Sequence, residues 1–241
     1  MFARACLIVL IALGIGSCID GHEEIWIGAN GSGRAKFRYE FPASALGWYG
    51  GEAAIRRELD ALITKNDDLE FLSYTLGRND DRIILHINAG FDSPWDLTRF
   101  STDWATTSDE TKSAASPFAG ENSLELRGRF IRVHRIMDWS KALPGAAFVP
   151  ASRWQGHKLI TKVHLPLPAA ESNATRSENG GRTLIWETAV AEAIRQPIDI
   201  RFTAPVPLRN FLTPVLILVA AIVAVIFFVV YRTRRNRRLA S

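Results

Sequence analysis

The amino-acid sequence predicts an α+β domain, a mostly antiparallel sheet with two amphipathic helices on one face, followed by one transmembrane helix. Three observations lead to this prediction. Seven or eight short segments alternate apolar and polar residues with the period of a half-buried strand. Two segments place their apolar residues three or four positions apart, as an amphipathic helix does. Near the C-terminus, about twenty consecutive residues are apolar, which is enough to cross a bilayer.

The first two predicted strands flank a glycine-rich turn. Ile25 and Ile27 alternate with Trp26, and the aromatic residues within 37–41 alternate with charged ones. The sequence Asn-Gly-Ser-Gly at 30–33 lies between them, where glycine tolerates the backbone angles of a hairpin. The glycines could instead hold a phosphate, but neither a helix nor a Lys-Ser/Thr pair follows them. We therefore expect a β-hairpin.

Two helices and a second hairpin are predicted next. Residues 51–66 carry their apolar residues on one helical face. Residues 69–91 form two strands around a polar turn that contains Asp80 and Asp81. This acidic pair could bind a cation, but solvated turn residues are favoured. The second helix is predicted over 93–104, because Ser, Pro and Asp at its start have the spacing of a capping box.

The rest of the domain predicts four further strands. The first covers 123–136, with a β-bulge at Gly128, where the alternation changes phase. The polar segment 106–122 before it is longer than most loops, and we expect an exposed excursion, with a lid over a ligand as the alternative. The other three strands are expected within 158–167, 183–190 and 198–204.

The N-terminus has the features of a lipoprotein signal. The apolar run 5–15 is too short to span a hydrocarbon core of about 30 Å, because a helix rises only about 1.5 Å per residue. Ile-Gly-Ser-Cys at 15–18 resembles the lipobox of bacterial lipoproteins, which implies removal of 1–17 and attachment of diacylglycerol to Cys18. Cys6 leaves with the signal, so Cys18 has no disulfide partner in the mature chain. An incidental thiol is the alternative.

The C-terminus predicts a single membrane span. Residues 211–231 contain no charge, and 205–210 form a short linker before them. Five arginines fill the tail 232–241, so the positive-inside rule places this tail in the cytoplasm and the domain 18–204 on the outer side of a bacterial cell (inner) membrane. A buried core helix would not explain these arginines, which are Arg232, Arg234, Arg235, Arg237 and Arg238.

The charge distribution argues against a nucleic-acid-binding protein. The pI is about 9.3, but much of the basic excess lies at the two ends of the chain, and residues 19–210 carry a net charge of −2. We therefore expect membrane lipids as partners, with an envelope protein as a further candidate, and no nucleic acid.

Catalytic and metal-binding motifs are missing from the sequence. It contains no G-x-S-x-G, no H-E-x-x-H, no P-loop and no C-x-x-C. The histidines lack the spacing of metal ligands, and we interpret them as sheet or turn residues with ordinary partners. They are His22, His86, His134, His157 and His164. The expectation is a non-enzymatic domain with no metal and no cofactor.

Tryptophan provides the only candidate contact residues. Two of the seven tryptophans, Trp48 and Trp154, lie in loops marked by glycine and proline. A tryptophan ring suits the membrane interface because it is apolar and carries one N–H group that can stay hydrated. Trp48 and Trp154 are therefore predicted to contact the membrane or a ligand, although most tryptophans lie in the core.

The order of these parts resembles the LppM family of bacterial lipoproteins. The resemblance covers the lipobox, the "NGSG" turn, "GFDSPWDL" at the second helix, the "RTLIWET" strand and the final span with its arginine tail. It implies an exported α/β domain and, by analogy with a mycobacterial member that is associated with phosphoinositol mannosides, a lipid- or glycolipid-binding role.

Two other classes stay open, an envelope scaffold and an unrecognised hydrolase. A lipid binder predicts an apolar cavity, a scaffold predicts a filled core with an external apolar patch, and a hydrolase predicts a polar cleft with titratable groups.

Overall fold

The computed structural model describes residues 19–65, 69–96, 120–142 and 149–207. The chain divides into two units, 1–205 and 206–241, and every element below belongs to the first. Cys18, the predicted span 211–231 and the arginine tail lie outside the described residues. Among the residues that are described, none of the helices is both long and apolar enough to cross a membrane.

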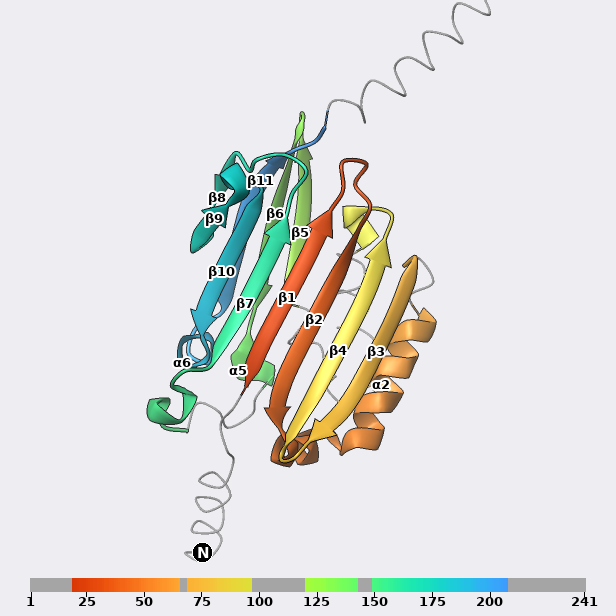
Figure 1. The fold of residues 1–241 in the computed structure, drawn as a ribbon, viewed down its shortest axis with the longest axis vertical. Coiled ribbons are helices and arrows are strands. Elements are labelled where there is room, and N and C mark those ends of the chain that lie inside the picture. The colour runs from red at the N-terminus through yellow and green to blue at the C-terminus, as the bar shows by residue number, and fades with distance from the viewer. Residues whose placement is uncertain (1–18, 66–68, 97–119, 143–148, 208–241) are drawn as a thin grey trace, which may run out of the picture. The chain divides into compact units, whose positions relative to one another are not determined.

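The larger sheet has seven strands in the described part of the chain, in the order β3-β4-β2-β1-β7-β10-β9 (Figure 1). Neighbouring strands are antiparallel, except that β1 and β7 are parallel. The strands are β1 (Asp20–Ile27), β2 (Gly33–Pro42), β3 (Phe71–Asn79), β4 (Arg82–Phe91), β7 (Lys158–His164), β9 (Arg176–Glu178) and β10 (Thr183–Ala189).

The smaller sheet has four described strands, in the order β5-β6-β11-β8, and all of its pairs are antiparallel. They are β5 (Glu121–Arg127), β6 (Phe130–Met137), β8 (Glu171–Ser172) and β11 (Ile198–Pro205). Figure 1 shows this sheet behind the β1, β7 and β10 part of the larger one. The two sheets therefore form a partial sandwich.

One long helix, α2 (Glu52–Lys65), covers the inner face of the larger sheet beside β3 (Figure 1). Its Leu59 and Leu62 are buried, and the Arg56 guanidinium donates a hydrogen bond of 2.7 Å to the carbonyl of Leu76 on β3. The short helices are η1 (Ala43–Tyr49), α5 (Trp139–Ala142), η3 (Ala151–Trp154), η4 (Asn179–Gly181) and α6 (Val190–Ala193).

A buried ion pair joins the two sheets in the middle of the sandwich. The Arg135 guanidinium of β6 donates to both carboxylate oxygens of Glu23 on β1, at 2.5 and 3.1 Å. Tyr39 and Thr161 donate their hydroxyl protons to the same carboxylate. Burial, and then the adjacent Glu23 carboxylate, raise the pKa of Tyr39 well above its usual value, so the phenol keeps its proton. The carboxylate therefore has partners from both sheets.

Apolar side chains fill the remaining space around this ion pair. Alternate residues of each strand point inward, which is why Ala35, Ile83, Ala89 and Phe91 are almost fully buried. The inner residues of the smaller sheet, such as Phe202, join the same cluster. The hydrophobic core therefore lies between the two sheets and beneath α2.

Several predictions are confirmed by these elements. The fold is mixed and mostly antiparallel, and the "NGSG" segment forms the β1–β2 turn with Gly31 at a φ of 91°. Asp80, with a φ of 54°, lies in the β3–β4 turn, as expected of a turn residue. At the predicted second helix the Ser93 N–H donates to Asp96 Oδ2 at 2.8 Å, which is one bond of the predicted capping box. The rest of 93–104 lies outside the described residues.

Two expectations about the sheet are wrong. The described residues contain eleven strands in two sheets, whereas the alternation predicts seven or eight strands in one sheet. Gly128 is not a bulge within one long strand. With a φ of 60° it forms the turn between β5 and β6. A two-residue turn reverses the chain and shifts the alternation in the same way as a bulge, so the pattern alone does not separate them.

Candidate functional site

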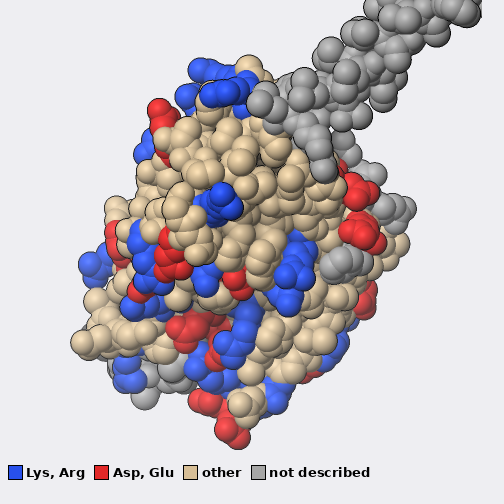
Figure 2. Space-filling view, turned by 45° about the horizontal axis from the view of Figure 1, so that its top comes forward, with Lys and Arg blue, Asp and Glu red and all other residues tan. Residues whose placement is uncertain are grey.

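The outer face of the larger sheet, which points away from the smaller sheet, carries charged side chains across six strands. The strand registers place seven basic and five acidic residues on this face. The basic residues are Arg34, Lys36, Arg38, Arg82, Lys158, Lys162 and Arg176, and the acidic ones are Asp20, Glu24, Glu40, Glu178 and Glu187. Figure 2 shows acidic and basic groups interspersed over this side of the molecule. We call this surface the outer face.

A tryptophan lies on the outer face near the β1–β2 turn. The ring of Trp26 is half-buried and stacks on the imidazole of His164, with centroids 5.3 Å apart and planes at 6°. The Arg34 guanidinium lies 4.6 Å and the Lys36 ammonium 5.8 Å from the centre of the same ring. His164 is held in place by Glu24, 2.8 Å from its Nε2. These five residues form what we call the Trp26 cluster.

The chemistry of the Trp26 cluster suits the surface of a membrane. An indole ring partitions to the interface between headgroups and hydrocarbon, and cations beside it attract anionic lipid headgroups. The same contacts also stabilise the sheet, since a cation over an exposed ring contributes about 0.5–1 kcal/mol. A tryptophan at this position is therefore compatible with stable folding even when no ligand is bound.

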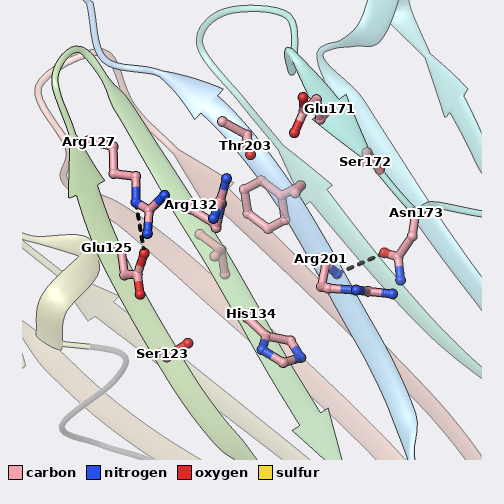
Figure 3. Close-up of a pocket in the computed structure, with 12 residues that line it drawn as sticks. Ser123, Glu125, Arg127, Arg132, His134, Glu171, Ser172, Asn173, Arg201 and Thr203 are labelled. Atoms are coloured by element: carbon pink, nitrogen blue, oxygen red, sulfur yellow. Dashed lines mark hydrogen bonds and ion pairs between the residues drawn. The ribbon is translucent and has the colours of Figure 1, made fainter.

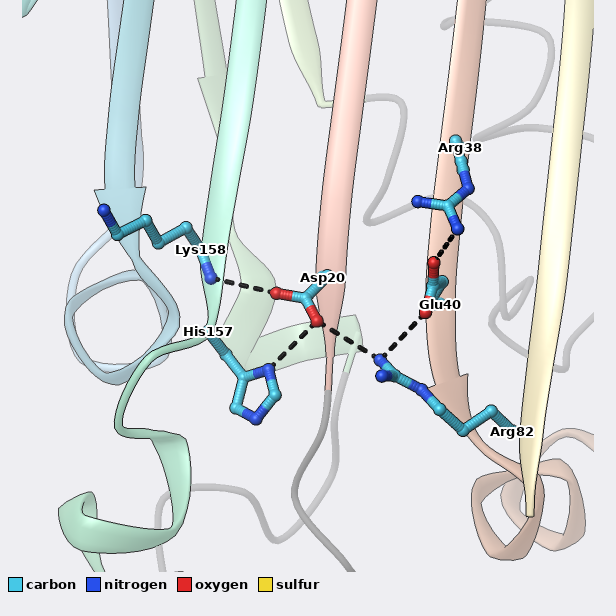
Figure 4. Close-up of polar contacts among 6 residues, drawn as sticks. All are labelled: Asp20, Arg38, Glu40, Arg82, His157 and Lys158. Atoms are coloured by element: carbon cyan, nitrogen blue, oxygen red, sulfur yellow. Dashed lines mark hydrogen bonds and ion pairs between the residues drawn. The ribbon is translucent and has the colours of Figure 1, made fainter. Parts of the chain in front are cut away.

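A second polar network lies at the other end of β1, directly after the predicted lipid anchor (Figure 4). The Asp20 carboxylate contacts His157 Nδ1 at 3.0 Å and the Arg82 guanidinium at 3.2 Å, and it accepts the backbone N–H of Lys158 at 3.2 Å. Partial burial by itself raises the pKa of Asp20, but these hydrogen bonds outweigh it and the pKa lies below its usual value.

The network extends across the outer face to β2. Arg82 also contacts Glu40 at 3.2 Å, and Glu40 in turn pairs with Arg38 (Figure 4). These contacts connect the first residue of β1 to β4 on one side and to β7 on the other. The start of β1, two residues after Cys18, is therefore fixed to the body of the sheet.

A polar groove of about 540 Å³ lies on the smaller sheet, on the side opposite the outer face (Figure 3). Arg127, Arg132 and Arg201 come from three adjacent strands, and we call this the arginine groove. Arg127 pairs with Glu125 at 3.2 Å, and Arg201 pairs with Asp199 at 3.2 Å. The other lining residues are Ser123, Val133, His134, Glu171, Ser172, Asn173, Phe202 and Thr203.

The amide of Asn173 gives the arginine groove a rigid rim. Its Oδ1 accepts hydrogen bonds of 2.8 Å from the Trp186 indole and from the Arg201 backbone, and its Nδ2 donates to the Asp199 carbonyl at 2.7 Å. Ten of the twelve residues that line the groove are polar or charged, so it is not the apolar cavity that the acyl chains of a lipid would need.

The arginine groove also contains a serine, a histidine and an aspartate in neighbouring positions. Ser123 and His134 are register partners, and His134 Nε2 lies 3.1 Å from Asp199 Oδ1. The Ser123 hydroxyl, however, makes no hydrogen bond to His134 in the described structure. Nucleophilic catalysis needs that contact between nucleophile and base.

The sequence-predicted contact residues are not brought together at one site. Cys18 and the five tail arginines lie outside the described residues, as does the side chain of Trp48, whose backbone forms part of η1. Trp154 is only 5% exposed, so it belongs to the core and not to the surface. Its neighbours at 151–153, 155 and 156 are exposed, but the ring itself is buried.

Four histidines have acidic neighbours, as the interpretation of ordinary partners requires. His157 contacts Asp20, His164 contacts Glu24, His134 contacts Asp199, and His22 lies 3.9 Å from Glu24. Within the described ranges, no three histidine, cysteine or acidic residues gather into a group that could hold a metal ion.

The Trp26 cluster is the feature that the sequence reasoning missed, although a signal for it was present. Trp26 alternates with Ile25 and Ile27, whose side chains pack against the core, so a strand with this pattern must turn the indole outward. The basic residues Arg34 and Lys36 alternate in the same way on the next strand. Pairing the two strands from the predicted turn would have placed all three residues on one face.

Comparison with known proteins gives a solved structure to set beside this fold. No family model matches the chain, and no curated protein matches it. The domain is a mixed α/β fold built mostly of strands. It is similar to the folded domain of LppM from Mycobacterium tuberculosis, determined by NMR, with a TM-score of 0.48 and 10% sequence identity over 79% of this chain and 91% of that chain.

Proposed function

We propose that this chain is an exported, membrane-anchored lipoprotein whose non-enzymatic domain binds lipid or glycolipid headgroups at the membrane surface. The observation that supports it best is the Trp26 cluster, which places an indole and two cations on a solvent-facing sheet surface. An anionic headgroup offers a charge for Arg34 and Lys36, and the interface offers a suitable environment for the indole.

The attachment of the domain fits this role. Asp20 fixes the start of β1 to both neighbouring parts of the sheet, so a diacylglycerol on Cys18 would hold the domain close to the bilayer. A diacylglycerol carries two acyl chains and is a stable anchor by itself, and a spanning helix at 211–231 would keep the chain in the membrane permanently. The lipid on Cys18 would then position the domain more than retain it.

The test is cross-linking to a lipid with a photoreactive headgroup. Full-length protein is reconstituted into vesicles that contain the reactive lipid and about one third anionic lipid, and labelled peptides are mapped by mass spectrometry. We expect labels on the peptide that contains β1 and β2. The double variant R34E/K36E should lose most of this labelling, because it reverses two charges beside Trp26.

The matched control is R127E/R132E, which reverses two charges on the opposite sheet and should leave the labelling unchanged. Equal labelling of both variants and the unmodified protein would contradict the proposed role. Thermal unfolding of each variant shows whether a loss of labelling reflects a loss of folding.

A second candidate function is that of an envelope interaction subunit, and the arginine groove favours it. Its mixed acidic, basic and hydroxyl lining offers hydrogen-bond donors and acceptors to a polar segment of another protein. The photoreactive amino acid benzoylphenylalanine at Thr203, introduced in cells, would trap such a protein. Benzoylphenylalanine at Thr75, on the outer face, provides the comparison. This second function predicts a defined cross-linked protein with the probe at Thr203 and none with the probe at Thr75.

A further inference from the structure

The path of the strands attaches the two predicted anchors to opposite ends of the domain. β1 begins at Asp20, two residues after Cys18, and β11 ends at Pro205, six residues before Phe211 at the start of the predicted span. Figure 1 shows β1 and β11 pointing the same way, so the first strand starts at one end and the last strand finishes at the other.

The distance between the attachment points follows from the contact between the sheets. Glu23 on β1 binds Arg135, and the register partner of Arg135 on β11 is Ile200. Asp20 lies three residues before Glu23, and Pro205 lies five residues after Ile200. Eight steps at about 3.3 Å each separate the two points by about 26 Å along the strands.

Neither connecting segment is long enough to span this distance. Six residues from Pro205 to Phe211 reach at most about 21 Å, and two residues from Cys18 to Asp20 reach about 7 Å. If the strands stood perpendicular to the membrane, the segment that leads to the farther anchor would have to span about 26 Å. It would also have to cross the headgroup layer before that anchor reached the hydrocarbon core. Both anchors reach one bilayer only when the strands are strongly inclined toward its plane.

The charges identify the side that faces the lipid. The outer face carries seven basic and five acidic residues, together with Trp26 and the histidines 22, 86 and 164. The exposed face of the smaller sheet carries three basic and four acidic residues. These are Arg127, Arg132 and Arg201, against Glu121, Glu125, Glu171 and Asp199. The outer face is the better complement to an anionic leaflet.

We propose that the domain lies along the membrane with the outer face of its larger sheet against an anionic leaflet and the arginine groove turned away from it. This inference rests on the proposed function and adds to it the orientation and the lipid charge. The groove then faces the envelope space, where a soluble or wall-attached molecule has access to it.

The test measures the depth of two labels on the full-length protein in vesicles with about one third anionic lipid. Thr75, exposed on β3, lies on the outer face, and Ser123, exposed on β5, lies on the opposite face. T75C and S123C each receive a fluorophore, and quenching by lipids with a spin-labelled headgroup is compared. The unmodified protein, treated with the same fluorophore, shows how much label attaches to native thiols.

We expect quenching at T75C to exceed that at S123C by about twofold or more, because packed sheets hold their two faces at least about 10 Å apart. Equal quenching, or stronger quenching at S123C, would overturn the orientation. A twenty-residue Gly/Ser insertion after Pro205 removes the length restraint. With this insertion, 0.5 M salt should abolish the difference, since the face is then held by charge alone.

Failure of the orientation and failure of the proposed function give different results. If lipid cross-links persist on β1 and β2 while T75C and S123C are quenched equally, headgroup binding stands and the orientation is wrong. If T75C is the better quenched but R34E/K36E leaves the cross-links unchanged, the orientation stands and headgroup binding by the Trp26 cluster is wrong.

Discussion

The buried ion pair between Glu23 and Arg135 offers the sharpest test of how the two sheets are held together. The side chains are 4% and 11% exposed, and one is contributed by each sheet. Arg135→Met removes the positive charge and keeps most of the apolar stem. The Glu23 carboxylate then stays in the core, and the donors left to it within the described residues are the Tyr39 and Thr161 hydroxyls.

The expected cost is about 3–5 kcal/mol, the usual result of leaving one buried charge without its partner. Burial by itself would lower the pKa of Arg135, but Glu23 and Tyr39 raise it above its ordinary value, so the guanidinium is charged at neutral pH. For a domain of this size, 1 kcal/mol shifts the melting temperature by about 2–4 °C, so we expect a fall of about 6–20 °C.

The measurement is thermal unfolding of the full-length protein in detergent, followed by near-ultraviolet circular dichroism. The control is Arg127→Met, which removes an exposed arginine from its pair with Glu125 and should cost less than about 1 kcal/mol. In the double variant E23L/R135M neither charge remains. It should be more stable than R135M, although the Tyr39 and Thr161 hydroxyls lose their acceptor.

The reasoning would be refuted if R135M melted within about 2 °C of the unmodified protein, or if the effects of E23L and R135M were simply additive. Either outcome would mean that the ion pair does not connect the sheets energetically. Additive effects would also show that the carboxylate finds other partners or water when the guanidinium is removed.

Three further predictions concern packing, pH and backbone space. Leu62→Ala should lower the unfolding free energy by about 2–5 kcal/mol in chemical denaturation, because this α2 side chain is 2% exposed, and a cost below about 1 kcal/mol would contradict the packing. Asp20→Asn should lower the melting temperature at pH 7. Since the pKa of Asp20 is lower in the folded state than in the unfolded chain, the ionised carboxylate stabilises the fold above pH about 4, and this stabilisation is lost at lower pH. The difference in melting temperature between D20N and the unmodified protein should therefore vanish in acid. Gly33→Ala should destabilise by about 3 kcal/mol or more, because a Cβ there would lie 2.0 Å from the Trp26 carbonyl oxygen, whereas Gly77→Ala on β3 meets no atom within 4 Å and should change the melting temperature little.

Local features of the fold were predictable because short-range physics determines them. The "NGSG" turn, the amphipathic α2 and the Ser93–Asp96 cap each depend on residues within one or two turns of chain. Their signals are backbone preference and side-chain period, and both are visible in a single sequence. The same signals placed a break in the alternation at Gly128, although they did not distinguish a turn from a bulge.

The division into two sheets could not be predicted, because it depends on pairings between distant segments. β1 pairs in parallel with β7, more than one hundred residues later, and β6 pairs with β11, about sixty residues later. Strand alternation shows which residues face the core but not which strands are neighbours. Trp154 illustrates the same limit, because the glycine and proline around it give no indication that the ring packs inward.

The Trp26 cluster is predictable from sequence only in part, because some of its contacts depend on a short turn and others depend on pairing between distant strands. Trp26 and Arg34 are brought together by the short β1–β2 turn, which the sequence predicts. His164, which stacks on the Trp26 ring, comes from β7 and is positioned only by the long-range parallel pairing. The cationic half of the cluster is therefore encoded locally, while the support that orients the indole depends on the completed sheet. A variant that weakens the β1–β7 pairing should consequently disturb the orientation of Trp26 before it disturbs the hairpin that carries Arg34.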